Sequence, residues 1–160
     1  MPSLPNTREF QDRLNTLYRT QFIKFGATPK GIYWFCPKRQ NRRFSIITNE
    51  ITKIVKNSPV RLADVGCGYG SFINYLCSNR TLNIEKYEGY DLCPDLIAEC
   101  KNRINKDWAS FKIGTHPLNS TMFTIMSGTY NLAVTTDVSL WEEYIFDSLK
   151  KCWEKTTLAM

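Results

Sequence analysis

The chain has 160 residues, of which 42% are hydrophobic and 22% charged, and this composition is typical of one globular domain with a packed core. No run approaches the roughly 18 apolar residues of a membrane span, and the N-terminus lacks an apolar segment of the signal-peptide type, so we expect a cytoplasmic protein with no membrane association. The net charge of +6 leaves attraction to nucleic acid or to an acidic substrate open, although many soluble proteins carry such an excess.

The N-terminal third is predicted to be helical. Apolar residues recur at helical spacing over residues 7–20, a loop containing glycine and proline follows at 26–31, and a second helix is expected over 40–55. Arg42 and Arg43 lie at the start of the second helix, where cations oppose the helix dipole. These two side chains are therefore either simply solvated or directed at an anion.

From residue 60 the pattern changes to short apolar strands that alternate with helices. The expected strands are 60–65, 86–90, 109–113 and 130–135, and the expected helices are 71–78, 94–104 and 139–155. Residues 114–129 are expected to form a loop. Strands that alternate with helices favour βαβ units. The sequence therefore predicts an α/β fold of Rossmann-like type in residues 59–160, with a mostly parallel sheet, helices on both faces and an N-terminal helical extension.

The cysteine and histidine content argues against a metal site. Six cysteines are present, but none forms a CxxC pair, and His116 is the only histidine. Zinc sites need closely spaced pairs of such ligands. Several of the cysteines fall in apolar stretches, where a free cysteine acts as a small hydrophobic residue. We therefore expect reduced thiols and no bound metal.

A glycine-rich turn follows the first expected strand, over residues 64–72 (DVGCGYGSF). Its glycines are spaced GxGxG rather than the GxGxxG of dinucleotide-binding loops, and Asp64 precedes them. A carboxylate at Asp64 would repel a pyrophosphate but would suit an ammonium group. Asp91, at the end of the second expected strand, is placed to accept hydrogen bonds from both hydroxyls of a ribose. These features indicate a ligand with a ribose, an amino group and no phosphate, and S-adenosylmethionine (SAM) has all three properties.

Residues 64–70 resemble the first sequence motif of class I SAM-dependent methyltransferases, and residues 90–92 (YDL) resemble the second. The chain resembles in particular a subgroup of small bacterial and phage enzymes of this family, through the N-terminal residues described next. The resemblance implies a SAM site formed by the two motifs. The residues that it assigns to the cofactor are Asp64, Gly66, Cys67, Gly68, Tyr69, Gly70, Asp91 and Leu92.

The N-terminal segment extends this resemblance. Residues 25–34 and 39–44 look like the helix and loop that cover the cofactor in that subgroup. The resemblance implies that residues 1–58 form a helical cover over the site, in which Gln40 and Arg43 approach the carboxylate of the cofactor or an anionic substrate.

Downstream, residues 130–137 (YNLAVTTD) look like the fourth motif, which borders the transferred methyl group in this family. This placement puts Thr136 in the cofactor site and makes Asp137 a candidate catalytic base, with His116 as a weaker candidate. Many relatives carry an acidic residue after the third strand that binds the adenine amino group, but this chain has Thr115 there. Thr115 or a backbone group would then contact the adenine.

The class I fold normally has seven strands, whereas four are predicted here, and the chain stops at 157–160, where a fifth would begin. The sequence therefore predicts a sheet that is truncated after the fourth strand and its helix. An unpaired edge at that strand would favour pairing with another chain, so a homo-oligomer is a further expectation.

Three functions remain open from the sequence. The first is a SAM-dependent methyltransferase that acts on a small-molecule or protein acceptor. The second is a shortened, non-catalytic SAM-binding module that works as a partner or regulatory subunit. The third is an RNA methyltransferase-like protein that uses the basic residues 38–43; nucleic acid is the less favoured partner, and its binding would depend steeply on salt.

Overall fold

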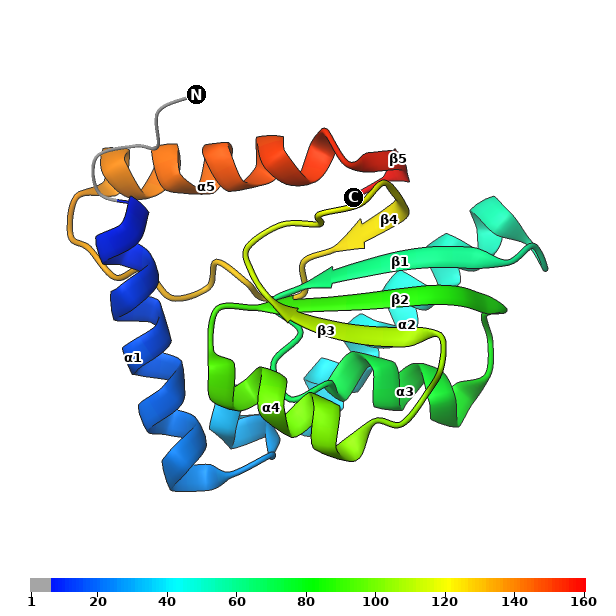
Figure 1. Cartoon of the computed structure of the whole chain (residues 1–160), viewed down its shortest axis with the longest axis horizontal. Helices are drawn as coiled ribbons and strands as arrows, with labels where there is room; N and C mark the ends of the chain where they lie inside the picture. Colours follow the sequence, from blue (N-terminus) through cyan, green and yellow to red (C-terminus); the bar gives the residue numbers. More distant parts are fainter. Residues whose placement is uncertain (1–6) are drawn as a thin grey trace.

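The computed structural model describes residues 7–160, in which five parallel strands form one sheet with helices on both of its faces (Figure 1). The strands are β1 (Val60–Val65), β2 (Ile84–Asp91), β3 (Ala109–Ile113), β4 (Thr121–Ile125) and β5 (Thr156–Ala159). The helices are α1 (Thr7–Phe25), the short 3-10 helix η1 (Pro29–Ile32), α2 (Pro37–Val55), α3 (Ser71–Asn79), α4 (Pro94–Arg103) and α5 (Val138–Trp153). The predicted α/β, Rossmann-like architecture is confirmed.

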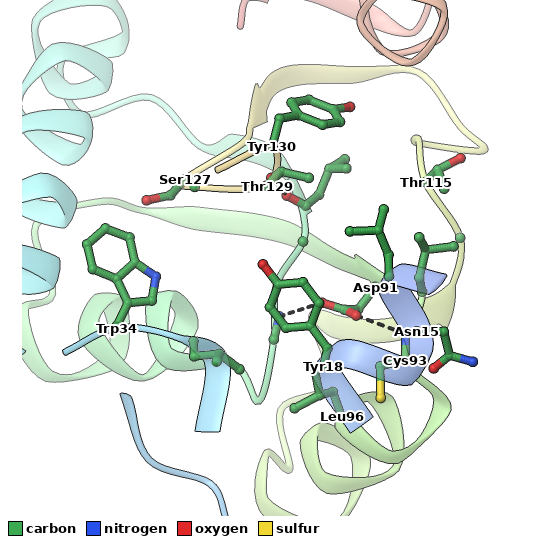
Figure 2. Close-up of a pocket in the computed structure, with 18 of the residues that line it drawn as sticks. Asn15, Tyr18, Trp34, Asp91, Cys93, Leu96, Thr115, Ser127, Thr129 and Tyr130 are labelled. Atoms are coloured by element: carbon green, nitrogen blue, oxygen red, sulfur yellow. Dashed lines mark hydrogen bonds between the residues drawn. The ribbon is translucent and has the colours of Figure 1, made fainter. Parts of the chain in front are cut away.

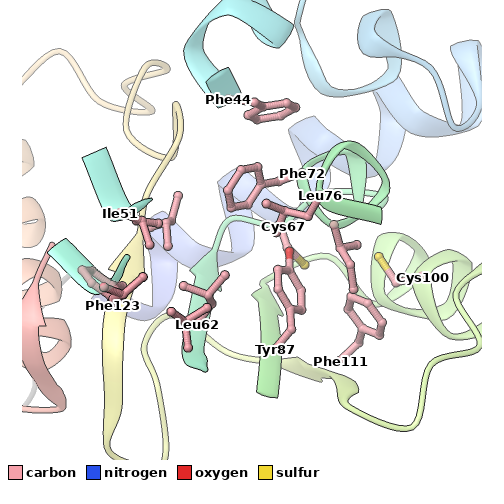
Figure 3. Packing of buried hydrophobic residues seen from close by; sticks show 14 of the residues in the cluster. Phe44, Ile51, Leu62, Cys67, Phe72, Leu76, Tyr87, Cys100, Phe111 and Phe123 are labelled. Atoms are coloured by element: carbon pink, nitrogen blue, oxygen red, sulfur yellow. The ribbon is translucent and has the colours of Figure 1, made fainter. Parts of the chain in front are cut away.

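Both faces of the central strand β1 are buried. Leu62 belongs to a large cluster with Phe44 of α2 and Phe72 of α3 (Figure 3). Ala63, the next residue, belongs to a separate cluster with Cys152 of α5. Because a strand that is covered on both faces needs apolar side chains in both directions, β1 is apolar along most of its length.

The chain reverses its progress across the sheet between β3 and β4. The strand order is β3-β2-β1-β4-β5, so β2 and β3 lie on one side of β1, and β4 then pairs with the other side. In open α/β sheets, ligands bind outside the carboxyl ends of the strands at such a reversal. The carboxyl ends of β1, β2 and β4 therefore mark the place where a site is expected.

The position of the fourth strand differs from the prediction. The structure places β4 inside the segment that was expected to be a loop, whereas residues 130–135 form turns and bends instead of a strand. Four of the five residues of β4 are buried, so the strand lacks the alternation of apolar and polar residues that marks a half-buried strand. The apolar residues of 130–135 serve another purpose, because Tyr130 and Val134 pack on an aromatic cluster between α1 and α5.

The sequence predicts a sheet that is truncated after the fourth strand and its helix, and this prediction is wrong, because a fifth strand follows. β5 pairs in parallel with β4, and Thr156 Oγ1 lies 2.6 Å from Thr124 Oγ1 across the pair. The signal in the sequence was weak because β5 has four residues, of which Thr157 and Leu158 are exposed. On the β4 side of the described sheet the edge strand is β5, so the self-association predicted at that edge would involve β5.

Helix α1 lies beside the carboxyl ends of the strands (Figure 1). It continues five residues beyond the predicted end and stops at Gly26, whose positive φ of 63° is typical of a glycine that ends a helix. Phe10 of α1 makes edge-on contacts with Trp141 and Tyr144 of α5. These contacts hold α1 over the end of the sheet where a site is expected.

The N-terminal segment predicted over 1–58 includes residues 1–6, which lie outside the described part of the chain. Within it, α2 begins at Pro37, three residues before the predicted start, and proline is common at the first position of a helix. Across residues 7–160, no helix combines the length and the apolar content that crossing a membrane requires.

Candidate functional site

A cavity lies at the carboxyl ends of β1, β2 and β4, between these strands and α1 (Figure 2). Its wall is formed by α1, the segment after η1, the glycine-rich loop, the end of β2 and the segments that follow β3 and β4. Asp91 is the only charged residue among the described residues that line it. The cavity therefore suits a ligand that is cationic or uncharged where it meets this carboxylate, rather than a phosphate.

The glycine-rich loop passes close to the segment that follows β4. Gly66 has a φ of 77°, and a Cβ added there would lie 2.8 Å from Oγ1 of Thr129. The Thr129 hydroxyl in turn donates to the Val65 carbonyl over 2.7 Å. Only glycine combines this left-handed conformation with so close an approach. The loop and the segment after β4 are thereby held together at the cavity wall.

Asp91 is held at the end of β2 by two backbone donors. Its Oδ2 accepts from the Gly68 N–H and its Oδ1 from the Cys93 N–H, each over 2.9 Å. Burial raises the pKa of Asp91, and these backbone hydrogen bonds oppose the rise. A carboxylate has about four acceptor positions, so each oxygen can accept one further hydrogen bond. A pair of neighbouring hydroxyl groups matches this arrangement.

Tyr18 of α1 lies next to Asp91 in the cavity (Figure 2). Burial, together with the nearby charge of Asp91, raises the pKa of the Tyr18 phenol to about 12. The hydroxyl therefore stays protonated at neutral pH and is available as a hydrogen-bond donor. It cannot serve as a base at that pH.

Asp64 lies near the end of β1, two residues before Gly66, and is not among the residues that line the cavity. Its side chain is buried and accepts a hydrogen bond of 2.5 Å from the Tyr87 hydroxyl. Burial raises the pKa of Asp64 to about 7, although the bond from Tyr87 lowers it. The structure thus places Asp64 in the core, where it supports the loop, rather than at a position that faces an ammonium group directly.

The structure brings five of the predicted cofactor residues together in the cavity wall. These are Gly66, Gly68, Asp91, Leu92 and Thr115. Three others, Cys67, Tyr69 and Gly70, are buried residues of the loop itself. Their side chains and backbone support the loop and do not line the cavity.

The two cofactor residues predicted on α2, Gln40 and Arg43, do not line this cavity. Gln40 is buried and donates from Nε2 to Oγ of Ser71 over 3.4 Å, which ties the start of α2 to the start of α3. Arg43 places its guanidinium 4.9 Å from the ring centroid of Trp34. Trp34 lines the main cavity, whereas Arg43 lines a neighbouring one.

The sequence predicts Thr136 and Asp137 at the end of a strand, and this prediction is wrong. Both are exposed and outside the cavity wall, because the fourth strand ends at Ile125. Asp137 caps α5 instead, since its Oδ1 accepts from the Leu140 N–H over 3.1 Å. The carboxylate of Asp137 therefore caps a helix in this structure and does not line the cavity.

His116 also stays outside the residues that line the cavity. Its Nδ1 lies 3.1 Å from Oγ1 of Thr115. Burial lowers the pKa of His116, and the charge of Lys151 lowers it further. Its contact with the site is therefore indirect, through Thr115.

Several residues of the cavity wall were not predicted from the sequence. Among them, Asn15 of α1 and Ser127 after β4 carry buried side-chain oxygens, Oδ1 and Oγ, that have no hydrogen-bond partner in the described part of the protein. Leaving such an atom unpaired costs about 1–3 kcal/mol, which a bound ligand can remove. The one available signal was the spacing of Asn15 and Tyr18, which puts both on the side of α1 that carries Leu14.

No protein-family model matches the sequence, and no curated protein matches it. Solved structures do. A SAM-dependent methyltransferase from Leishmania major aligns with a TM-score of 0.65 and 15% identity, over 94% of this chain and 56% of that one. The plantazolicin methyltransferase BpumL, in complex with a pentazolic desmethylPZN analogue and S-adenosylhomocysteine (SAH), aligns with a TM-score of 0.62 and 16% identity, over 95% of this chain and 57% of that one. Magnesium protoporphyrin IX methyltransferase from Synechocystis, with bound SAM, gives 0.61 and 13%, over 98% and 74%.

The chain thus spans just over half the length of the first two of these structures. At 13–16% identity the likeness establishes the fold. The chain has the class I, Rossmann-like fold of SAM-dependent methyltransferases.

Proposed function

We propose that this chain binds SAM in the cavity at the ends of β1, β2 and β4 and transfers its methyl group to a small-molecule or protein acceptor. The observation that carries the proposal is the Asp91 carboxylate, which is fixed by the Gly68 and Cys93 N–H groups and lines the cavity. Its free acceptor positions match the two hydroxyls of a ribose. Three structural neighbours with this fold, named above, are methyltransferases, and two of them were solved with SAM or SAH.

The chemistry of the cavity wall fits SAM better than it fits a phosphate-containing nucleotide. No Lys, Arg or His of the described chain lines the cavity, so a pyrophosphate would meet no cation there. The sulfonium of SAM is cationic, and the rings of Tyr18, Trp34, Tyr130 and Tyr144 are available to such a group. The unpaired oxygens of Asn15 and Ser127 are also suited to a ligand with several polar groups.

We assign roles to the wall residues on this basis. Asp91 would hold the ribose hydroxyls, and Leu92 and Thr115 would lie near the adenine. Gly66 and Gly68 would allow the backbone to approach the ligand closely. Cys67, Tyr69, Gly70 and Asp64 would act indirectly by holding the loop in shape. Thr136 is no longer assigned to the cofactor.

The cavity wall positions reactants but offers no evident base. When bound, SAM supplies an activated methyl group, which passes to a lone pair of the acceptor as the C–S bond breaks and its electron pair stays on sulfur. Burial raises the pKa of Tyr130 and Tyr144, as it does that of Tyr18, so these phenols stay protonated. The described residues therefore contribute orientation and exclusion of water. The acceptor would release its proton to solvent, or would react as an anion.

With Asp91 assigned to the ribose, no other carboxylate, histidine or lysine lines the described wall, and this favours one alternative, a non-catalytic SAM-binding module. Both functions predict cofactor binding and differ only in turnover. Incubation with SAM and a panel of acceptors, followed by measurement of SAH, separates them. Formation of SAH that depends on an acceptor supports the enzyme, and tight SAM binding without any turnover supports the module.

Cofactor binding itself is tested by calorimetric titration with SAH. The wild-type chain should bind SAH, and Asp91→Asn should weaken binding about tenfold or more, since a charge-assisted hydrogen bond contributes about 1.5–3 kcal/mol. Asp107→Asn removes an exposed carboxylate elsewhere and is the matched control, which should bind like the wild type. Wild-type affinity in Asp91→Asn, or no SAH binding at all, would contradict the proposal.

A further inference from the structure

A second cavity adjoins the proposed cofactor cavity on the side of Trp34. The two share Tyr18, Ile32, Trp34 and Gly128 in their walls. The second cavity is not lined by Asp91, Leu92 or Thr115, and Trp34 lies across the first cavity from Asn15 and Thr115 (Figure 2). The second cavity therefore opens from the end of the first that is farthest from the residues assigned to the adenine.

Two arginines give the second cavity a positive charge that the described chain does not neutralise. Arg39 and Arg43 are one turn apart on α2, and both line the cavity. No carboxylate among residues 7–160 forms an ion pair with either of them. Arg39 lies in the first turn of α2, which contains no acidic residue, so the helix dipole also opposes its charge. A bound anion would relieve both unfavourable effects.

Aromatic side chains form much of the remaining wall. Trp34 and Tyr33 line the cavity together with Phe35, which is 74% exposed. The guanidinium of Arg43 already stacks over the Trp34 ring. The exposed Phe35 ring and the half-buried Trp34 ring offer flat apolar surfaces, and the planar guanidinium group of arginine binds a carboxylate with two parallel hydrogen bonds. The wall thus combines a flat apolar surface for a ring with guanidinium groups that bind an anion.

We infer that the second cavity binds the methyl acceptor, and that this acceptor is a small aromatic carboxylate. Its ring would lie against Trp34 and Phe35, and its carboxylate would be bound by Arg39 and Arg43. This inference rests on the proposed function, because it places the acceptor beside the cavity assigned to SAM. SAM also carries a carboxylate, so the carboxylate that the two arginines bind has two candidate sources, the acceptor and the cofactor.

Arg39 separates these two sources of the carboxylate. It lines the second cavity and is absent from the wall of the first. Arg43 is closer to the boundary, since a Cβ added at Gly128 would lie 3.7 Å from its Nη1. An acceptor held by both arginines should therefore depend on Arg39, whereas the cofactor should not.

The test uses the full chain saturated with SAH and ligand-observed NMR titrations with three probes. These are 4-hydroxybenzoate, its neutral amide 4-hydroxybenzamide, and acetate, which has the carboxylate without the ring. The variants are Arg39→Gln and Arg43→Gln. Arg42→Gln is the control, because it removes the same charge from the same helix at an exposed residue that lines neither cavity.

We expect 4-hydroxybenzoate to bind at least tenfold more tightly than the amide or acetate. Arg39→Gln and Arg43→Gln should each weaken 4-hydroxybenzoate binding at least fivefold, and Arg42→Gln should leave it unchanged. Equal binding of acid and amide, or 4-hydroxybenzoate binding that survives Arg39→Gln, would overturn the inference. So would a loss of SAH affinity in Arg39→Gln without a change for 4-hydroxybenzoate, which would assign the carboxylate to the cofactor. If the wild type binds no SAH, the proposed function itself fails, which is a distinct outcome.

Discussion

The two walls of the main cavity differ in how their polar groups are satisfied. In the glycine-loop wall (Gly66, Gly68 and Asp91), the chain bonds its own groups to one another, as when Gly68 N–H donates to Asp91. In the α1–β4 wall (Asn15 and Ser127), two buried oxygens have no partner in the described structure. The first wall is therefore held in shape by its own hydrogen bonds and keeps only the free acceptor positions of Asp91 for a ligand, whereas the second has two polar atoms with no internal partner. Changes to the first should affect folding and binding together, and changes to the second should affect binding alone.

The largest expected effect is that of Gly66→Ala, in the glycine-loop wall. The substitution adds a Cβ 2.8 Å from Thr129 Oγ1 at a residue with positive φ, so we expect a loss of about 2–3 kcal/mol in the free energy of unfolding and a fall in SAH affinity of about tenfold or more. Urea denaturation and calorimetry measure the two effects.

The matched control for this variant is Gly26→Ala. Gly26 also has a positive φ, but a Cβ there would meet no atom within 4 Å. It should lose about 1 kcal/mol from backbone strain, with SAH affinity unchanged. If both variants lose the same free energy of unfolding, the close packing between the loop and Thr129 does not contribute to the effect of Gly66→Ala.

The pH dependence of stability tests the buried carboxylate that precedes the glycine-loop wall in the sequence. Asp64 has a pKa of about 7 in the folded chain, against an ordinary value of 3.8. Between these values the folded state holds a proton that the unfolded state has lost, so this group makes stability fall as the pH rises from about 4 to 7, by at most about 1.4 kcal/mol per pH unit. Above pH 7 its contribution should level off.

The variant for this measurement is Asp64→Asn, which can still accept the Tyr87 hydrogen bond but does not titrate. Urea denaturation at several pH values should show a flatter profile than in the wild type, and Asp107→Asn should keep the wild-type slope. An unchanged slope in Asp64→Asn would mean that Asp64 is ionised in the folded chain at these pH values.

The α1–β4 wall is tested by Asn15→Leu. This variant removes a buried oxygen that has no partner, so the free energy of unfolding should stay the same or rise. SAH affinity should fall about 5- to 10-fold, since the ligand loses a polar contact of about 1 kcal/mol or more. A loss of stability with normal SAH affinity would show that Asn15 is bonded within the protein and contradict the difference between the two walls.

The smallest effect is expected for Asp137→Ala, outside both walls. Loss of the cap on α5 should cost about 1 kcal/mol of stability, and Asp137→Ser should restore most of it. SAH affinity and any methyl transfer should not change. A loss of turnover in a variant of normal stability would restore Asp137 as a candidate base.

The difference between the walls also separates what could be predicted from the sequence from what could not. The bounds of β1 and β3, the glycine-rich loop and Asp91 depend on local patterns, namely a short apolar run, closely spaced glycines and an acid at a strand end. Asn15 and Ser127 depend on tertiary packing. The periodicity of α1 indicates an apolar side, but not that this side packs on α5 and over the sheet.

The error at Thr136 and Asp137 has the same origin. A strand buried on both faces has no periodic signal, so the sequence does not indicate β4, and the apolar pattern of residues 130–135 predicts a strand there instead. The predicted strand end therefore lies about ten residues after the observed one. As a result, the prediction omits Ser127, which lines the cavity, and includes Thr136 and Asp137, which do not.

The central claim, that Asp91 binds the ribose of SAM in this cavity, is tested most directly by a crystal structure of the chain with SAH. The account predicts SAH at the carboxyl ends of β1, β2 and β4, with both ribose hydroxyls within hydrogen-bond distance of the Asp91 oxygens, about 2.5–3.0 Å. SAH bound elsewhere, or bound in the cavity with its ribose away from Asp91, would contradict it.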